Sequence, residues 1–157
     1  MPYTVNLVAV PEQAIAFLRE PGPISGLEER LRLLRESISQ DGVRPAGAFM
    51  SRHFDEAEED GDADYEVAVP ITAQADGSLP GRVGEARVTV IPAHHAFVTH
   101  HSGPHEQLPG AHAALFAYLD ALGYSAAGPV CRIYLRGPES ASDPAQYVTE
   151  VRLPIAR

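Results

Sequence analysis

The sequence predicts an α+β fold in which two β-α-β-β units form a curved antiparallel sheet around a central cleft, with one helix packed on each half. Three observations support this prediction: turn-forming residues that recur at a fixed offset, a matched helical stripe in each half, and strand-like stretches around each helix. The 157 residues, 45% of them hydrophobic and 21% charged, suit one compact globular domain. We therefore expect a single domain over residues 1–157, with repeats over residues 3–75 and 82–156.

The turn-forming residues recur at an offset of 81 positions. The matched pairs are Pro11 and Pro92, Gly22 and Gly103, Pro23 and Pro104, Gly42 and Gly123, and Gly47 and Gly128. Because the backbone limits of glycine and proline determine which turns they can form, matched positions imply matched turns. The pattern indicates an internal duplication.

Each half contains apolar residues at the 4-3-4 spacing of one helical stripe. The stripes are Leu27, Leu31, Leu34 and Ile38 in the first half and Leu108, His112, Leu115 and Leu119 in the second. Both are followed by a glycine, Gly42 or Gly123, as expected where a helix ends in a left-handed turn. The stripes predict helices over residues 24–40 and 105–122.

Strand-like stretches flank both helices. A stretch interrupted by one proline precedes each helix, at residues 4–20 and 86–102. Two further strands follow each helix, at 47–54 and 65–71 in the first half and at 128–135 and 147–155 in the second.

Alternation along the strands predicts which side chains face each helix. In the first half, Tyr65, Val67, Val69 and Ile71 are expected under the helix, with Glu66 on the other face. In the second half, the expectation places Cys131 and Ile133 under the helix. It places Arg132 and Tyr134 on the opposite, partly polar face, toward the cleft.

The motifs of the second half resemble the GyrI-like, or bacterial effector-binding, domain. "HHSGPHEQL" at 100–108, "GPVCRIYL" and "YVTEVRLPI" are similar to that family's His-x-Gly-Pro-Tyr, Gly-Pro-x-x-Glu-x-Tyr and Thr-Glu-x-x-x-Pro. The resemblance covers nearly the whole chain and implies a small-molecule pocket between the two halves. It implies a small hydrophobic or aromatic ligand, and we expect no cofactor.

The chain departs from the family pattern at the pocket. The family's pocket glutamate falls at Arg132, the aromatic residue before it at Cys131, and the tyrosine after Gly-Pro at His105. A guanidinium stays protonated and only donates, so it favours carboxylate or phosphate partners. Tyr134 and Glu150 keep family positions, and Glu66 is the first-half counterpart of Glu150, since each stands four residues before a proline.

The candidate ligand-binding residues therefore come from both halves. They are Arg132, Tyr134, Glu66, Glu150, Phe49, Ser51, His53 and His105. Two alternatives stay open: Arg132 pairs with Glu150 or Glu66 inside the protein, and the aromatic residues serve ordinary sheet packing.

The histidines of "HHSGPHEQL" also raise the possibility of a metal site. Alternation directs His100 and His101 to opposite faces, and His112 replaces a core leucine, so these side chains are not expected to converge on one ion. We expect a strand-to-helix joint without a metal, with His105 near the pocket.

Charge and hydropathy argue against two classes of protein, those that bind nucleic acid and those that cross a membrane. The net charge of −9 disfavours direct nucleic-acid binding, and much of it lies in "DEAEEDGDAD" at 55–64, which predicts a solvated loop. No apolar run is long enough to span a membrane and no signal peptide precedes the first strand, so a cytoplasmic location is expected.

Three functions agree with these features. The favoured one is a free-standing small-molecule binding protein that takes up a drug, toxin or metabolite without catalysis. The others are a hydrolase of reactive cyclopropane-type compounds and a protein-interaction module of the gyrase-inhibitor type, whose protein partner is unknown.

Overall fold

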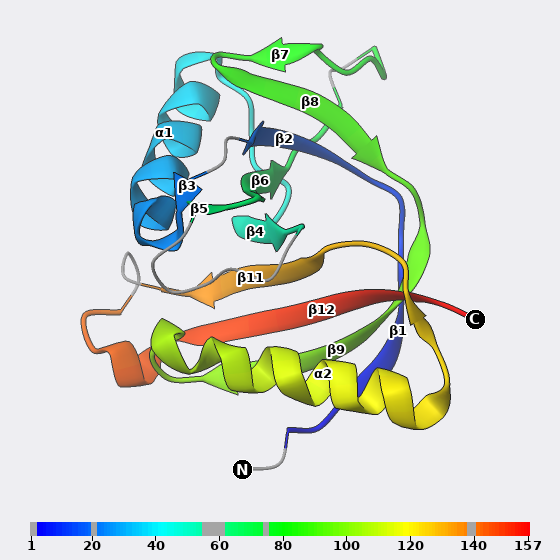
Figure 1. The fold of residues 1–157 in the computed structure, drawn as a ribbon. Coiled ribbons are helices and arrows are strands. Elements are labelled where there is room, and N and C mark those ends of the chain that lie inside the picture. Colours follow the sequence, from blue (N-terminus) through cyan, green and yellow to red (C-terminus); the bar gives the residue numbers. More distant parts are fainter. Residues whose placement is uncertain (1–2, 20–21, 55–61, 74–75, 138–140) are drawn as a thin grey trace. The chain divides into compact units, whose positions relative to one another are not determined.

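The computed structural model describes residues 3–19, 22–54, 62–73, 76–137 and 141–157, which form two compact units (Figure 1). One unit consists of residues 3–10 and 94–157, and the other of residues 11–93. Each unit has one α-helix on an antiparallel sheet, which confirms the predicted α+β class with its duplicated β-α-β-β unit. The grouping differs from the predicted halves because the first strand of each half pairs within the other unit. The single-domain organisation remains a prediction.

The unit of residues 11–93 contains five strands in the order β4-β6-β2-β8-β7. These are β2 (Gln13–Arg19), β4 (Met50–His53), β6 (Tyr65–Pro70), β7 (Arg82–Val83) and β8 (Ala86–Ile91). A short 3-10 turn, η1 (Ile24–Gly26), leads into α1 (Leu27–Gln40), which packs on β6, β2 and β8. A separate ribbon pairs β3 (Gly22–Pro23) with β5 (Asp62–Ala63).

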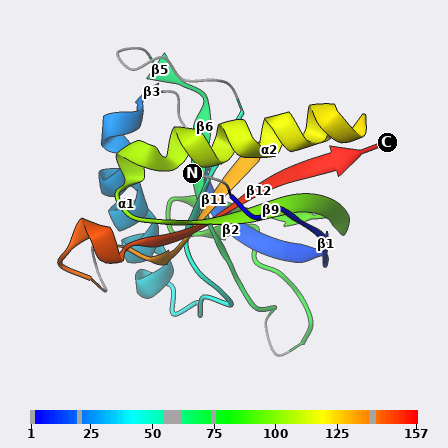
Figure 2. The ribbon, with the colours of Figure 1, turned by 90° about the horizontal axis from the view of Figure 1, so that it is seen from below.

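The other unit has the strand order β1-β9-β12-β11, with β10 also paired to β12. The strands are β1 (Asn6–Val10), β9 (His94–Ser102), β10 (Ser125–Ala126), β11 (Val130–Arg136) and β12 (Val148–Ala156). The 3-10 turn η2 (His105–Gln107) leads into α2 (Leu108–Leu122), and η3 (Pro144–Gln146) precedes β12. Figure 2 shows α2 lying along β9 and β12, which it contacts.

Both helices lie where the stripes predicted them. The stripe residues Leu27, Leu34 and Ile38 of α1 and Leu108, Leu115 and Leu119 of α2 are buried. Helix α2 ends at Gly123, whose φ of 74° is left-handed, as the glycine after the stripe indicated.

The strand register repeats with the same offset as the sequence. In one unit Ile15 lies opposite Pro70, and Arg19 lies opposite Glu66. In the other unit the residues 81 positions after Ile15 and Arg19 are Ala96 and His100, which lie opposite Pro154 and Glu150. The matching register supports the interpretation of the sequence as a duplication.

The predicted faces are right in the first half and wrong in the second. Tyr65 lies on the helix side of β6, since the Arg30 guanidinium of α1 stands 4.7 Å from the centre of its ring. In the second half, Val130 and Val151 belong to the core under α2, and Arg132 lies opposite Val151 on the same face. Arg132 and Tyr134 therefore face the helix side.

Cys131 and Ile133 take the opposite face of β11, because they lie opposite Arg152 and Glu150. The sequence analysis assigns these two side chains to the helix side, so the assignment of the two faces of β11 is reversed in the structure. The structure instead accommodates the guanidinium on the helix side through a hydrogen bond to α2, described below.

Leucines at equivalent stripe positions should stabilise the two units to a similar degree. Leu34 and Leu115 are both 0% exposed. We expect Leu34→Ala and Leu115→Ala each to lower the free energy of unfolding by about 2–5 kcal/mol, because truncation leaves a cavity in a packed core. Denaturant unfolding measures this loss. The matched control is Leu122→Ala, because the Leu122 side chain is 52% exposed. Its free energy of unfolding should change by no more than about 0.5 kcal/mol. Equal effects for all three variants would contradict the packing described.

Candidate functional site

Arg132 on β11 and His112 on α2 form the centre of the candidate site. The Arg132 Nε–H donates a hydrogen bond to His112 Nε2 over 2.9 Å. A protonated imidazole has no acceptor nitrogen, so this contact requires a neutral His112 with its proton on Nδ1. Helix α2 thus supplies the group that holds the guanidinium.

The electrostatics of this pair follow from burial. Burial, together with the smaller effect of the neighbouring Arg132 charge, lowers the pKa of His112 from 6.5 to about 3. Burial also lowers the pKa of Arg132, while the Tyr134 side chain acts in the opposite direction. Within the described residues Arg132 forms no ion pair with a carboxylate, so its positive charge is not neutralised there.

An aromatic group adjoins this charge through Tyr134, which interacts with Arg132. The His105 ring lies with its centre 5.2 Å from that of Tyr134 and 4.9 Å from that of Tyr147. His105 opens η2, so the strand-to-helix joint places its ring beside β11. Three of the predicted residues, Arg132, Tyr134 and His105, therefore come together.

Glu150 lies on the opposite face of the same sheet. Its carboxylate is 3.0 Å from His100 Nε2 and 2.5 Å from Arg152 Nε. The alternative in which Arg132 pairs with Glu150 or Glu66 finds no support, because alternation puts Arg132 and Glu150 on different faces and because Glu66 is paired with Arg52.

In the unit of residues 11–93, Phe49, Ser51 and His53 lie on the helix-bearing side. Ser51 Oγ is 2.8 Å from His53 Nε2, and the His53 ring is stacked on Tyr65 at 6.0 Å between centres. The guanidinium of Arg35 on α1 stands 5.8 Å from the centre of the Phe49 ring. These three predicted residues form a second polar and aromatic group.

Glu66 lies on the opposite face of β6 and is only 3% exposed. Arg52 Nη1 donates to its Oε2 over 2.6 Å. Burial raises the pKa of Glu66, and the charge of Arg52 opposes that rise. Glu66 therefore belongs to a buried ion pair on the face away from α1.

Six of the eight predicted residues thus lie on helix-bearing faces, and Glu66 and Glu150 do not. Sequence reasoning missed the partners His112, Tyr147, Arg52 and Arg152. The signal for His112 was present, because a histidine at the repeat position of Leu31 is a polar residue in an otherwise apolar stripe.

The predictions about a metal site, the histidine faces and the acidic loop can be compared with the structure only where residues are described. In these ranges no group of three or more His, Cys, Asp or Glu residues could hold a metal ion. His100 and His101 do face opposite ways, since they lie opposite Glu150 and Thr149. Most of the predicted acidic loop, residues 55–61, lies outside the described residues. No helix in the described part of the chain is both long and apolar enough to cross a membrane.

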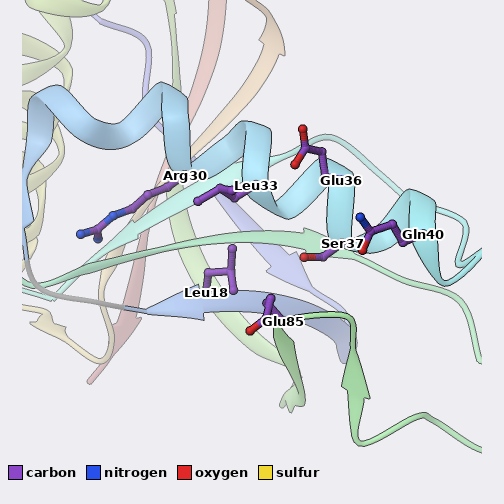
Figure 3. Close-up of a pocket in the computed structure, with 7 residues that line it drawn as sticks. All are labelled: Leu18, Arg30, Leu33, Glu36, Ser37, Gln40 and Glu85. Carbon is purple, nitrogen blue, oxygen red and sulfur yellow. The ribbon is translucent and has the colours of Figure 1, made fainter.

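A groove of about 430 Å³ lies beside α1, and none of the eight candidate residues lines it (Figure 3). Its lining residues are Leu18, Arg30, Leu33, Glu36, Ser37, Gln40 and Glu85. Its volume is within the range of small-molecule sites.

The two helices and the antiparallel strands define an α+β domain. The chain belongs to the GyrI-like small molecule binding domain family, which it matches over residues 3–156. No curated protein shows a significant match to the chain.

Solved structures share the fold. The EcmrR C-terminal domain superimposes with a TM-score of 0.88 at 20% identity, covering 100% of this chain and 99% of that domain. The chain spans 58% of the EcmrR chain in an EcmrR–DNA complex, with a TM-score of 0.87 and 99% of this chain covered at 20% identity. A hydrolase encoded by lin2189 from Listeria innocua gives 0.64 at 16% identity, with 97% and 91% coverage. SAV2435 bound to tetraphenylphosphonium gives 0.60 at 15% identity, with 99% and 94% coverage.

The neutral state of His112 predicts how stability depends on pH. The unfolded chain binds a proton at His112 near pH 6.5, whereas the folded protein binds it only near pH 3. Stability should therefore fall as pH falls from 6.5 toward 3, by up to about 1.4 kcal/mol per pH unit from this residue. His112→Gln keeps an acceptor for Arg132 and cannot titrate, so its free energy of unfolding should depend less on pH over this window. Identical slopes for the two proteins in urea unfolding would contradict the buried neutral imidazole.

Proposed function

We propose that the chain binds a small organic molecule on the helix-bearing side of β11, with Arg132 as the principal polar contact. The observation that carries this proposal is a half-buried guanidinium held by a neutral imidazole and not by a carboxylate. A buried charge without an opposite charge is costly, and a ligand that supplies one recovers part of that cost.

The surroundings of Arg132 suggest the class of ligand. The rings of Tyr134, His105 and Tyr147 offer flat apolar surfaces, and Arg132 favours a carboxylate, a sulfonate or a neutral acceptor. A cation would be repelled by the guanidinium. The ligand we propose is therefore an anionic or neutral aromatic compound.

We also propose that the ligand occupies a cleft between the two pseudo-symmetric halves, as the sequence predicts. Its support is that Phe49, Ser51 and His53 form a polar and aromatic group on the helix-bearing side of the other unit. Glu66 and Glu150, which lie on the opposite faces, are left out of the proposed ligand contacts.

The charge of the ligand should determine its affinity. We expect naphthalene-2-sulfonate to bind more tightly than 2-naphthylmethylammonium in isothermal titration, because only the anion can pair with Arg132. Arg132→Gln keeps a donor for His112 but removes the charge, so it should lower the affinity for the anion by about tenfold or more, as for a charged hydrogen bond of about 1.5–3 kcal/mol.

The matched control is Arg87→Ala, which removes an exposed arginine on β8 and should leave both affinities unchanged. Tighter binding of the cation that persists in Arg132→Gln would refute the proposed charge preference.

We assign no direct nucleic-acid contact to this chain, and the support is its net charge of −9. The EcmrR chain, which is solved in a complex with DNA, is longer than the part that resembles this chain. A cytoplasmic location also remains a prediction.

Hydrolysis is a second candidate function, because Glu66 is a buried carboxyl group. Its raised pKa would suit a general acid or base, but its ion pair with Arg52 and its place on the face away from α1 separate it from the Arg132 cluster. We therefore propose binding without catalysis.

Incubation with an electrophilic cyclopropane compound, followed by chromatography, distinguishes the two functions. We expect less than one turnover per protein molecule, because the family's reactive carboxylate position carries Arg132 and loss of an acid-base group typically costs about 10² to 10⁴ in rate. Many turnovers that disappear in Glu66→Gln or Glu150→Gln, but persist in the exposed control Glu12→Gln, would identify the protein as an enzyme.

A further inference from the structure

The groove beside α1 combines an apolar floor with a polar side chain that has no partner. Leu33 of α1 is 43% exposed, and Figure 3 shows it pointing toward Leu18 of β2. Ser37 is only 5% exposed, and its hydroxyl faces the gap between helix and strand. In the described part of the chain the Ser37 side chain makes no hydrogen bond, and its hydroxyl oxygen is not fully buried, so it is accessible to a ligand from within the groove.

The groove is held in shape by the turn that carries Glu85. The Gly84 N–H donates to Asp41 Oδ2 over 2.7 Å, which ties this turn to the end of α1. Gly84 has a left-handed φ of 57°, and a Cβ there would lie 2.9 Å from Ser37 Cβ. Only glycine allows the turn to approach the helix this closely, so the walls of the groove are preformed.

The charges of the groove determine which ligand complements it. Glu36 is occupied by an ion pair with Arg32 on the exposed side of the helix. The Arg30 guanidinium lies over the Tyr65 ring at 4.7 Å. Glu85 forms no ion pair with any described residue, which leaves one carboxylate to be neutralised by a ligand.

We propose that this groove binds an organic cation with an apolar body, in which an ammonium group pairs with Glu85 and donates to Ser37 while a ring or short alkyl chain lies between Leu18 and Leu33. This site is separate from the Arg132 cluster and opposite to it in charge preference, so it does not depend on the function proposed above. A volume of about 430 Å³ accommodates a molecule of the size of an arylalkylamine.

Three matched probes test the site: 2-phenylethylammonium, neutral 2-phenylethanol and anionic 3-phenylpropionate, each titrated into leucine-methyl-labelled protein and followed by NMR. We expect the cation to shift the Leu18 and Leu33 methyl signals at lower concentration than the other two. Glu85→Gln should weaken cation binding by about two- to fivefold, as for an exposed ion pair of ~0.4–1 kcal/mol, and leave binding of the alcohol unchanged.

Glu12→Gln, which changes an exposed glutamate outside the groove, is the matched control and should bind as the unmodified protein does. Ser37→Ala provides a second test, with weaker binding of both the cation and the alcohol. The proposal is overturned by equal shifts for all three probes, by tighter binding of the anion, by unchanged cation affinity in Glu85→Gln, or by shifts that spare Leu18 and Leu33.

Discussion

The hydrogen bond from Arg132 to His112 is the interaction on which the candidate site depends. A guanidinium beneath a helix normally requires a carboxylate, because burial of an unpaired charge costs several kcal/mol. Here the partner is an imidazole that burial keeps neutral, so the guanidinium is oriented but not neutralised. Tyr134 lies beside this charge, and the His105 ring packs on Tyr134; the proposed ligand contact at Arg132 depends on this arrangement.

Much of the fold could be predicted from the sequence because the determining signals are local. Glycine and proline restrict turns wherever they occur, and the leucine stripes define two helices whose buried residues the structure confirms. Strand pairing is a long-range property. The pattern of residues 6–10 does not reveal that this strand pairs with β9, and that of residues 86–91 does not reveal pairing with β2.

The site was predictable in its residue types but not in its partners. Alternation along β11 separates Cys131 and Ile133 from Arg132 and Tyr134, but it does not determine which pair faces the helix. That choice depends on His112, which comes from a different element and accepts a hydrogen bond from Arg132. Glu66 and Glu150 show the same limit. They have equivalent registers, yet Glu66 is paired with Arg52 and Glu150 with His100 and Arg152. Arg52 and His100 lie directly opposite these carboxylates on neighbouring strands, a pairing that alternation along a single strand does not reveal.

The protonation state of His112 tests the central claim most directly. Long-range proton–nitrogen correlation spectra of protein labelled with ¹⁵N-histidine, recorded near pH 6, report which ring nitrogen carries the proton. The account predicts a neutral imidazole with the proton on Nδ1 and Nε2 unprotonated as the acceptor for Arg132. A charged imidazolium, or a neutral ring with its proton on Nε2, would contradict it.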